Sequence, residues 1–165
     1  MVGLQVALDA QPLRGRALCQ LPGTMVCVPG EVLRSMAMDR PTCSRQLHRL
    51  LLRYAQATIN VLAQSSACNA LHTVEQRAAR WLLITRDRAR AEHFSLTQEF
   101  WSMMLGVRRP SVSVVASDLQ SMGIIRYTRG EVTVLDYKRL EEVACECYAL
   151  IRTEYARVLE ASVYH

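Results

Sequence analysis

The stretch that decides the fold is LTQEFWSMMLGVRRPSVSVVASDLQSMGIIRYTRG, residues 96–130. Thr97 is suited to cap a helix, and Gly106 is suited to end it, because glycine takes the left-handed conformation without penalty. Pro110 then supplies the first position of a second helix over 110–122, where its missing N–H costs nothing. Two short helices joined by a tight glycine-containing turn are typical of a helix-turn-helix.

A compact hairpin follows the second helix. Two β-branched runs, 124–128 and 131–135, meet at Arg129–Gly130, a pattern that predicts two short strands and a tight turn. A further short strand is predicted over 93–96, before the first helix. Helix, turn, helix and hairpin in this order make the winged form of the helix-turn-helix.

The start of the second helix and the hairpin carry residues that suit DNA. A recognition helix enters the major groove with its N-terminal residues, so its first turn meets bases and phosphates. Small side chains let the backbone approach, and arginine binds phosphate and guanine. The alternative for Arg108 and Arg109 is a solvated turn. We predict contact with double-stranded DNA through Thr97, Arg108, Arg109, Pro110, Ser111, Ser113, Val114, Ser117, Arg126 and Arg129.

The placement of charge agrees with this prediction. The chain of 165 residues has a net charge of +5, and all of its 20 basic residues except Lys138 are arginine. Residues 76–130 hold nine arginines against four carboxylates, so the whole excess lies in one third of the chain. This charge suits a nucleic acid partner. The preference for arginine over lysine is also typical of GC-rich genomes.

Composition argues against several other classes of protein. Half of the residues are apolar, which excludes a largely disordered chain. Charged residues interrupt every apolar run before the roughly 18 residues that a membrane span needs, and the start has no secretory pattern. We therefore expect a cytoplasmic protein with no membrane partner. No nucleophile–base pair or glycine-rich phosphate loop stands out, so we predict no enzyme.

Residues 44–70 contain neither proline nor glycine and predict one long helix. Apolar or small residues recur on it at alternating spacings of four and three, which favours a helix–helix dimer contact. The alternative is a helix packed on its own domain. The predicted dimer residues are Leu47, Leu51, Tyr54, Thr58, Val61 and Ser65.

Further elements are predicted before and after these. Short strands over 16–21 and 24–28 look like part of an incomplete sheet, since two or three strands are not stable alone. Thr73 and Gln76 form a capping box for a helix with Arg77 and Arg80 on its solvent side. Asp136 caps a last helix, with Leu140, Val143, Cys147 and Leu150 directed inward.

The six cysteines have no metal-ligand spacing in the sequence. They include no CxxC pair, and the four histidines stand at no ligand spacing from them. We therefore predict no metal and no disulfide, with buried or idle thiols instead. The CxC pair Cys145 and Cys147 is a candidate redox site. The cysteines are Cys19, Cys27, Cys43, Cys68, Cys145 and Cys147, and the histidines are His48, His72, His93 and His165.

The run at 96–130 is long and specific, and through it residues 67–157 resemble the C-terminal half of the Crp/Fnr transcription regulators. The resemblance implies that Arg109 reads guanine and that Ser111 replaces a small hydroxyl residue of the family helix. Pro110 departs from a frequent glutamate and Val114 from an arginine, so the half-site of the cyclic-AMP receptor should not be assumed. Most of the effector-binding β-roll is absent, which implies no bound effector or cofactor.

The fold class predicted from all of this is mainly α with a small β content. The expected parts are a truncated β-roll remnant over 1–43, a long dimerisation helix over 44–72, and a winged helix-turn-helix domain with C-terminal helices over 73–165. The predicted function is a homodimeric, sequence-specific DNA-binding transcription regulator, with RNA polymerase as a further partner. The alternative is a truncated interaction module that heterodimerises with full-length relatives and modulates them.

Overall fold

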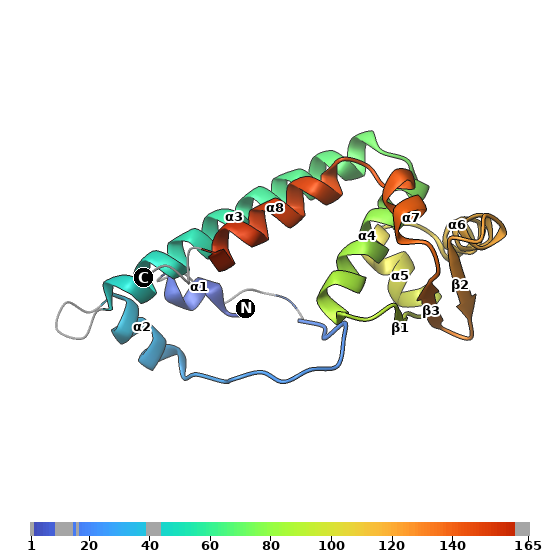
Figure 1. Cartoon of the computed structure of the whole chain (residues 1–165). Coiled ribbons are helices and arrows are strands. Elements are labelled where there is room, and N and C mark those ends of the chain that lie inside the picture. Colours follow the sequence, from blue (N-terminus) through green and yellow to red (C-terminus); the bar gives the residue numbers. More distant parts are fainter. Residues whose placement is uncertain (1, 9–14, 16, 39–43, 161–165) are drawn as a thin grey trace. The chain divides into compact units, whose positions relative to one another are not determined.

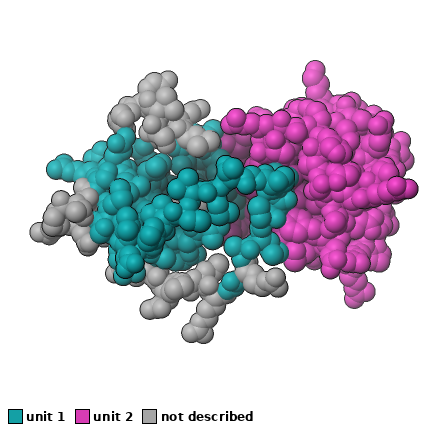
Figure 2. All heavy atoms as spheres, turned by 90° about the horizontal axis from the view of Figure 1, so that it is seen from below, with its two compact units in different colours: residues 1–61, 154–165 teal, residues 62–153 magenta. Residues whose placement is uncertain are grey.

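The computed structural model describes residues 2–8, 15, 17–38 and 44–160. The chain divides into two compact units, residues 1–61 with 154–165 and residues 62–153 (Figure 2). These units follow spatial contact, and the predicted division into 1–43, 44–72 and 73–165 stays a prediction. In chain order the elements are α1 (Leu4–Ala7), α2 (Gly30–Met38), α3 (Arg45–Leu71), α4 (Val74–Ala89), β1 (His93–Ser95), α5 (Gln98–Leu105), α6 (Arg109–Ser121), β2 (Ile125–Thr128), β3 (Glu131–Val134), α7 (Tyr137–Val143) and α8 (Cys147–Glu160).

The predicted winged helix-turn-helix is confirmed in the second unit (Figure 1). Thr97 caps α5 by accepting a hydrogen bond from the Phe100 backbone N–H, and Gly106 ends that helix with a φ of 64°. α6 begins at Arg109, one residue before the predicted start. β3 lies between β1 and β2 in an antiparallel sheet, so the hairpin is tied to the strand that precedes α5.

One apolar core holds the elements of this unit together. Trp101 on α5 is fully buried, and its ring packs edge to face with the Tyr127 ring, their centroids 6.1 Å apart. The inward face of α6 is apolar, with Val112, Val115, Ala116 and Leu119 buried. The other members of the core include Leu82, Leu83, Leu105, Ile124, Ile125, Val132 and Leu140.

The start of α4 follows the prediction, but the environment of its arginines does not. The capping box between Thr73 and Gln76 is confirmed. Arg77 and Arg80 were expected in solvent, and both are buried. The Arg77 guanidinium donates a hydrogen bond to the Leu105 carbonyl, one of the acceptors that the end of α5 leaves unsatisfied. A tertiary contact of this kind leaves no trace in the helical periodicity.

The two strands predicted near the N-terminus are wrong for the described residues. No strand is present over 17–29, and Arg16 lies outside the described part. Two short strands by themselves do not form a stable sheet. In the first unit α2 instead packs against the start of α3, where Ala37 and Leu51 are buried with Leu4, Leu33 and Leu47 beside them.

The helix predicted after Asp136 is broken into two. Asp136 caps α7 as expected, accepting from the Arg139 backbone N–H. The chain then leaves the helix at Ala144 and begins α8 at Cys147. A continuous helix would separate Cys145 and Cys147 by about 200° around its axis, whereas the corner lets both side chains be buried. Leu150, predicted to point inward, is exposed. Within the described residues no helix has the length and apolar content of a membrane span.

Candidate DNA-binding surface

The exposed side of α6 collects most of the residues that the sequence predicts for DNA contact. Arg108 is the residue before the first turn and Arg109 is its first residue, and both are exposed. The inward face of the helix is apolar, so the remaining side faces solvent. Along it lie the exposed Pro110, Ser113, Val114 and Ser117 with the half-buried Ser111.

Arg109 is held in place by a carboxylate from the preceding helix. Its guanidinium nitrogen Nη2 lies 2.5 Å from Oε2 of Glu99 on α5, and both side chains are more than half exposed. An exposed ion pair of this kind adds little to stability, because solvent screens it. Its effect here is to orient Arg109. A second link joins the same helices, since the Ser113 hydroxyl donates to Oε1 of Gln98 over 3.2 Å.

The hairpin is fixed to the helix-turn-helix by Tyr127 on β2. Its backbone N–H donates to Oε1 of Gln120 on α6 over 2.7 Å, and its hydroxyl donates to the Leu96 carbonyl over 3.0 Å. Burial raises the pKa of the Tyr127 hydroxyl, so the proton that makes this hydrogen bond is retained at physiological pH. The wing, defined as β2, β3 and their turn, therefore has a set position relative to α6.

The turn of the wing places an arginine in an unfavourable conformation. Arg129 has a φ of 52° and Gly130 a φ of 82°, so both central residues are left-handed, as the tight hairpin requires. The Leu96 backbone N–H donates to the Gly130 carbonyl over 2.7 Å, which joins this turn to the start of α5. Glycine accepts such a φ readily, but arginine has a side chain that opposes it. Arg126 and Arg129 are both exposed.

We expect Arg129→Asn to stabilise the wing and to weaken DNA binding at the same time. Asparagine tolerates the left-handed conformation better, so the free energy of unfolding should rise by about 0.5–1 kcal/mol. The lost charge should lower the slope of log affinity against log salt by about one for each protomer. Urea unfolding and a salt series of binding isotherms measure the two effects. If the variant is more stable but binds DNA with an unchanged salt slope, Arg129 does not contact the DNA.

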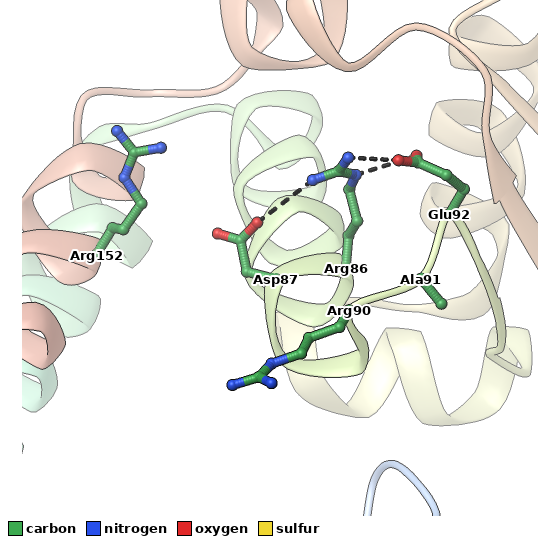
Figure 3. Close-up of a pocket in the computed structure, with 6 residues that line it drawn as sticks. All are labelled: Arg86, Asp87, Arg90, Ala91, Glu92 and Arg152. Atoms are coloured by element: carbon green, nitrogen blue, oxygen red, sulfur yellow. Dashed lines mark hydrogen bonds and ion pairs between the residues drawn. The ribbon is translucent and has the colours of Figure 1, made fainter. Parts of the chain in front are cut away.

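A polar pocket lies elsewhere on the second unit, at the end of α4 (Figure 3). Three arginines and two carboxylates line it, and Figure 3 shows Arg86 directed toward Asp87 and Glu92. The hydrogen bond from Arg86 lowers the pKa of Glu92, which keeps the pair ionised. Arg86 also lies over the Tyr137 ring at 4.6 Å from its centre. The positive charge is thus largely balanced inside the pocket, in contrast to the surface of α6 and the wing.

Sequence reasoning missed three features of this unit. Glu99, in the first turn of α5, was not recognised as the partner of Arg109. Gln120 was not recognised as an anchor of the wing. The structure also brings together Cys68, His72, Cys145 and Cys147. The first and third of these are 77 positions apart in the sequence. The available signal was the four-residue spacing of Cys68 and His72 on a predicted helix, which puts both side chains on one face.

Comparisons with known proteins agree with the geometry. Residues 76–143 match the family model of the Crp-like helix-turn-helix domain. The chain is 32% identical over 148 residues to the CRP-like cAMP-activated global transcriptional regulator of two Mycobacterium tuberculosis strains. That match covers 85% of the chain but only 64% of the relatives, so the chain spans just under two thirds of their length. A crystal structure of a Crp/Fnr-family transcriptional regulator from Eubacterium rectale shares the fold with a TM-score of 0.53 and 23% identity, covering 70% of the chain and 51% of that protein.

Proposed function

Since the chain belongs to the Crp/Fnr family of transcription regulators, which is not a class of enzymes, we propose that α6 reads sequence in the major groove of double-stranded DNA. The observation that carries this proposal is the start of α6. Arg108 and Arg109 stand there, exposed, where the free N–H groups and the positive end of the helix dipole attract phosphate. The wing adds Arg126 and Arg129 to the same unit.

Each of these residues has a role set by its chemistry. Arg109 donates two hydrogen bonds to one guanine, and its pair with Glu99 leaves the rest of the guanidinium fork for the base. Arg108 and the wing arginines bind phosphate, which positions the helix without reading sequence. The exposed Val114 offers an apolar contact suited to a thymine methyl group. The serines along α6 are small enough to let its backbone approach the groove floor.

A second part of the proposal is a homodimer through α3. Of the residues predicted for the seam, Leu51 is buried in its own chain beside Ala37, so it is not available to a partner. Leu52 and Ile59 are exposed on α3 and stand one heptad apart, which places them on one face of the helix. We therefore move the proposed contact to these two residues. Contact with RNA polymerase stays a prediction.

Ile59→Glu is expected to weaken the dimer. A carboxylate at the centre of an apolar helix contact loses its water without gaining a partner, so the monomer should be favoured. Sedimentation equilibrium of the whole chain measures the change, and at least a tenfold rise in the dimer dissociation constant is expected. Arg53→Ala, which changes the charge by the same one unit about 120° around α3, should leave the mass unchanged. An unaltered dimer in Ile59→Glu would rule out this face.

Selection from a pool of random duplexes tests the proposed reading of DNA. The whole chain should enrich one sequence with two-fold symmetry, its half-sites about 10 base pairs apart, because the symmetry of a dimer is matched by that of its site. Enrichment of single half-sites would support reading of DNA by the recognition helix and would contradict binding as a homodimer. A pool that stays random after repeated rounds would contradict sequence reading by α6, and would favour a module that acts through protein contacts.

A further inference from the structure

Two corners of the second unit bring three cysteines and one histidine together, side chains that commonly bind metal ions. Cys68 is near the end of α3 and His72 follows that helix, while Cys145 and Cys147 stand where α7 passes into α8. One ligand atom from each of the four lies within 4.8 Å of the others. The Cys68 and Cys145 sulfurs are 3.5 Å apart, and Nδ1 of His72 is 3.6 Å from the Cys147 sulfur. All three cysteines are buried.

These separations fit one ion better than a cluster or an arrangement of idle thiols. Zinc prefers four ligands in a tetrahedron, and Zn–S bonds of about 2.3 Å put two sulfurs about 3.8 Å apart. The observed atoms need to move only slightly to reach that arrangement. An iron–sulfur cluster contains several irons and holds its cysteines further apart. Three cysteines and one histidine form a common donor set of structural zinc sites.

The surrounding side chains prepare the ligands. Nε2 of His72 lies 3.2 Å from Oε1 of Glu146, a contact that places the proton on Nε2 and leaves Nδ1 free to bind a metal. Gln64 donates from Nε2 to the Cys147 sulfur over 3.0 Å, a hydrogen bond that a thiolate accepts well. Outer contacts of this kind orient the ligands of metal sites in proteins.

A buried arginine would balance the net charge of a metal bound at this site. Three thiolates and one divalent ion leave one net negative charge. Arg80 is buried, and its Nε has no hydrogen-bond partner among the described residues. Arg80 is near enough for its positive charge to act on Cys68. A buried guanidinium near the four side chains would balance the negative charge that the occupied site retains.

We propose that Cys68, His72, Cys145 and Cys147 bind one divalent thiophilic ion, with zinc as the best fit. With four protein ligands and no open position, the site is structural: it ties the corner between α3 and α4 to the corner between α7 and α8. This accounts for the corner between α7 and α8, where Cys145 lies before the first residue of α8, Cys147. It would also make the stability of the DNA-binding unit depend on metal.

Titration of the reduced, metal-free whole chain with Co²⁺ tests this proposal directly. Tetrahedral cobalt thiolate has intense visible bands and a near-ultraviolet sulfur-to-cobalt charge-transfer band, and both should saturate at one equivalent. Zn²⁺ should then remove the bands. At a hundredfold excess over its dissociation constant, Zn²⁺ should raise the thermal midpoint by roughly 5–10 °C.

Two variants make the assignment specific. Cys145→Ser should weaken Co²⁺ binding by at least a hundredfold and lose much of the charge-transfer band, whereas Cys27→Ser, at an exposed cysteine outside the cluster, should behave as wild type. Circular dichroism of metal-free Cys145→Ser against metal-free wild type checks that the fold is kept. If reduced wild type shows no saturable thiolate band, or if it is purified with iron and sulfide or with a Cys68–Cys145 disulfide that resists reduction, the proposal is overturned.

Discussion

Arg109→Ala is expected to lower the affinity for the selected duplex by about 10-fold to 100-fold for each half-site, because a good bidentate contact to guanine contributes about 1–3 kcal/mol. The affinity for unrelated duplexes should fall only a few-fold, through the loss of one charge. The side chain is exposed and its pair with Glu99 contributes little to folding, so the unfolding curve should not change. Fluorescence anisotropy with a labelled duplex measures both affinities under one salt condition.

Two further arginine variants show whether this effect belongs to base reading. Arg126→Ala, on the wing, should lower the affinity for selected and unrelated duplexes alike. It should also reduce the slope of log affinity against log salt by about one per protomer. Arg45→Ala removes the same charge from the exposed start of α3 and should change neither affinity by much. If Arg109→Ala lowers the affinity for both duplexes to the same degree, Arg109 contacts a phosphate and its assignment as the base-reading residue is wrong.

Trp101→Ala is expected to destabilise the second unit by about 3–5 kcal/mol, the usual cost of removing a large buried aromatic side chain. Trp101 is fully buried between the helices and the wing, and its ring contacts Tyr127, which anchors β2. The loss should therefore reach the DNA surface as well as the core. Urea unfolding can be followed by Trp81, the only other tryptophan of the chain, which lies on α4 of the same unit.

Two milder changes at α5 serve as controls. Met103→Ala alters an exposed side chain of the same helix and should cost little. Trp101→Phe should cost far less than alanine, because the buried indole nitrogen has no hydrogen-bond partner among the described residues and its removal relieves an unsatisfied group. A loss below about 1 kcal/mol for Trp101→Ala would mean that the core does not depend on this ring.

The parts of the fold that could be predicted are those with local causes. Thr97, Gly106 and Gly130 each impose a backbone conformation on a few residues, and the caps and turn appear at those places. The inward face of α6 follows from the spacing of its apolar residues alone. The exposed arginines at its start were predicted for the same reason, since position in a helix determines which residues precede its first turn.

Contacts between distant segments could not be predicted from the sequence. Arg77 is charged and was placed in solvent, but an unsatisfied carbonyl at the end of α5 gives it a buried partner. Leu51 fits a dimer seam by spacing, yet α2 covers it within the chain. The four proposed metal ligands lie in two pairs far apart in the sequence, Cys68 with His72 and Cys145 with Cys147. Only the folded chain shows that Cys68 and Cys145 are in contact. The periodicity of apolar residues indicates which side of a helix is buried. It does not indicate which other segment packs against that side.

The ratio of two dissociation constants decides between sequence reading and general attraction of DNA by arginine. The whole chain is titrated against its selected duplex and against a duplex with the same base pairs in permuted order, at one physiological salt concentration. Reading by α6 predicts a preference of at least about 10³-fold for the selected duplex, as sequence-specific DNA-binding proteins show. A ratio near one, with the same salt dependence for both duplexes, would contradict it.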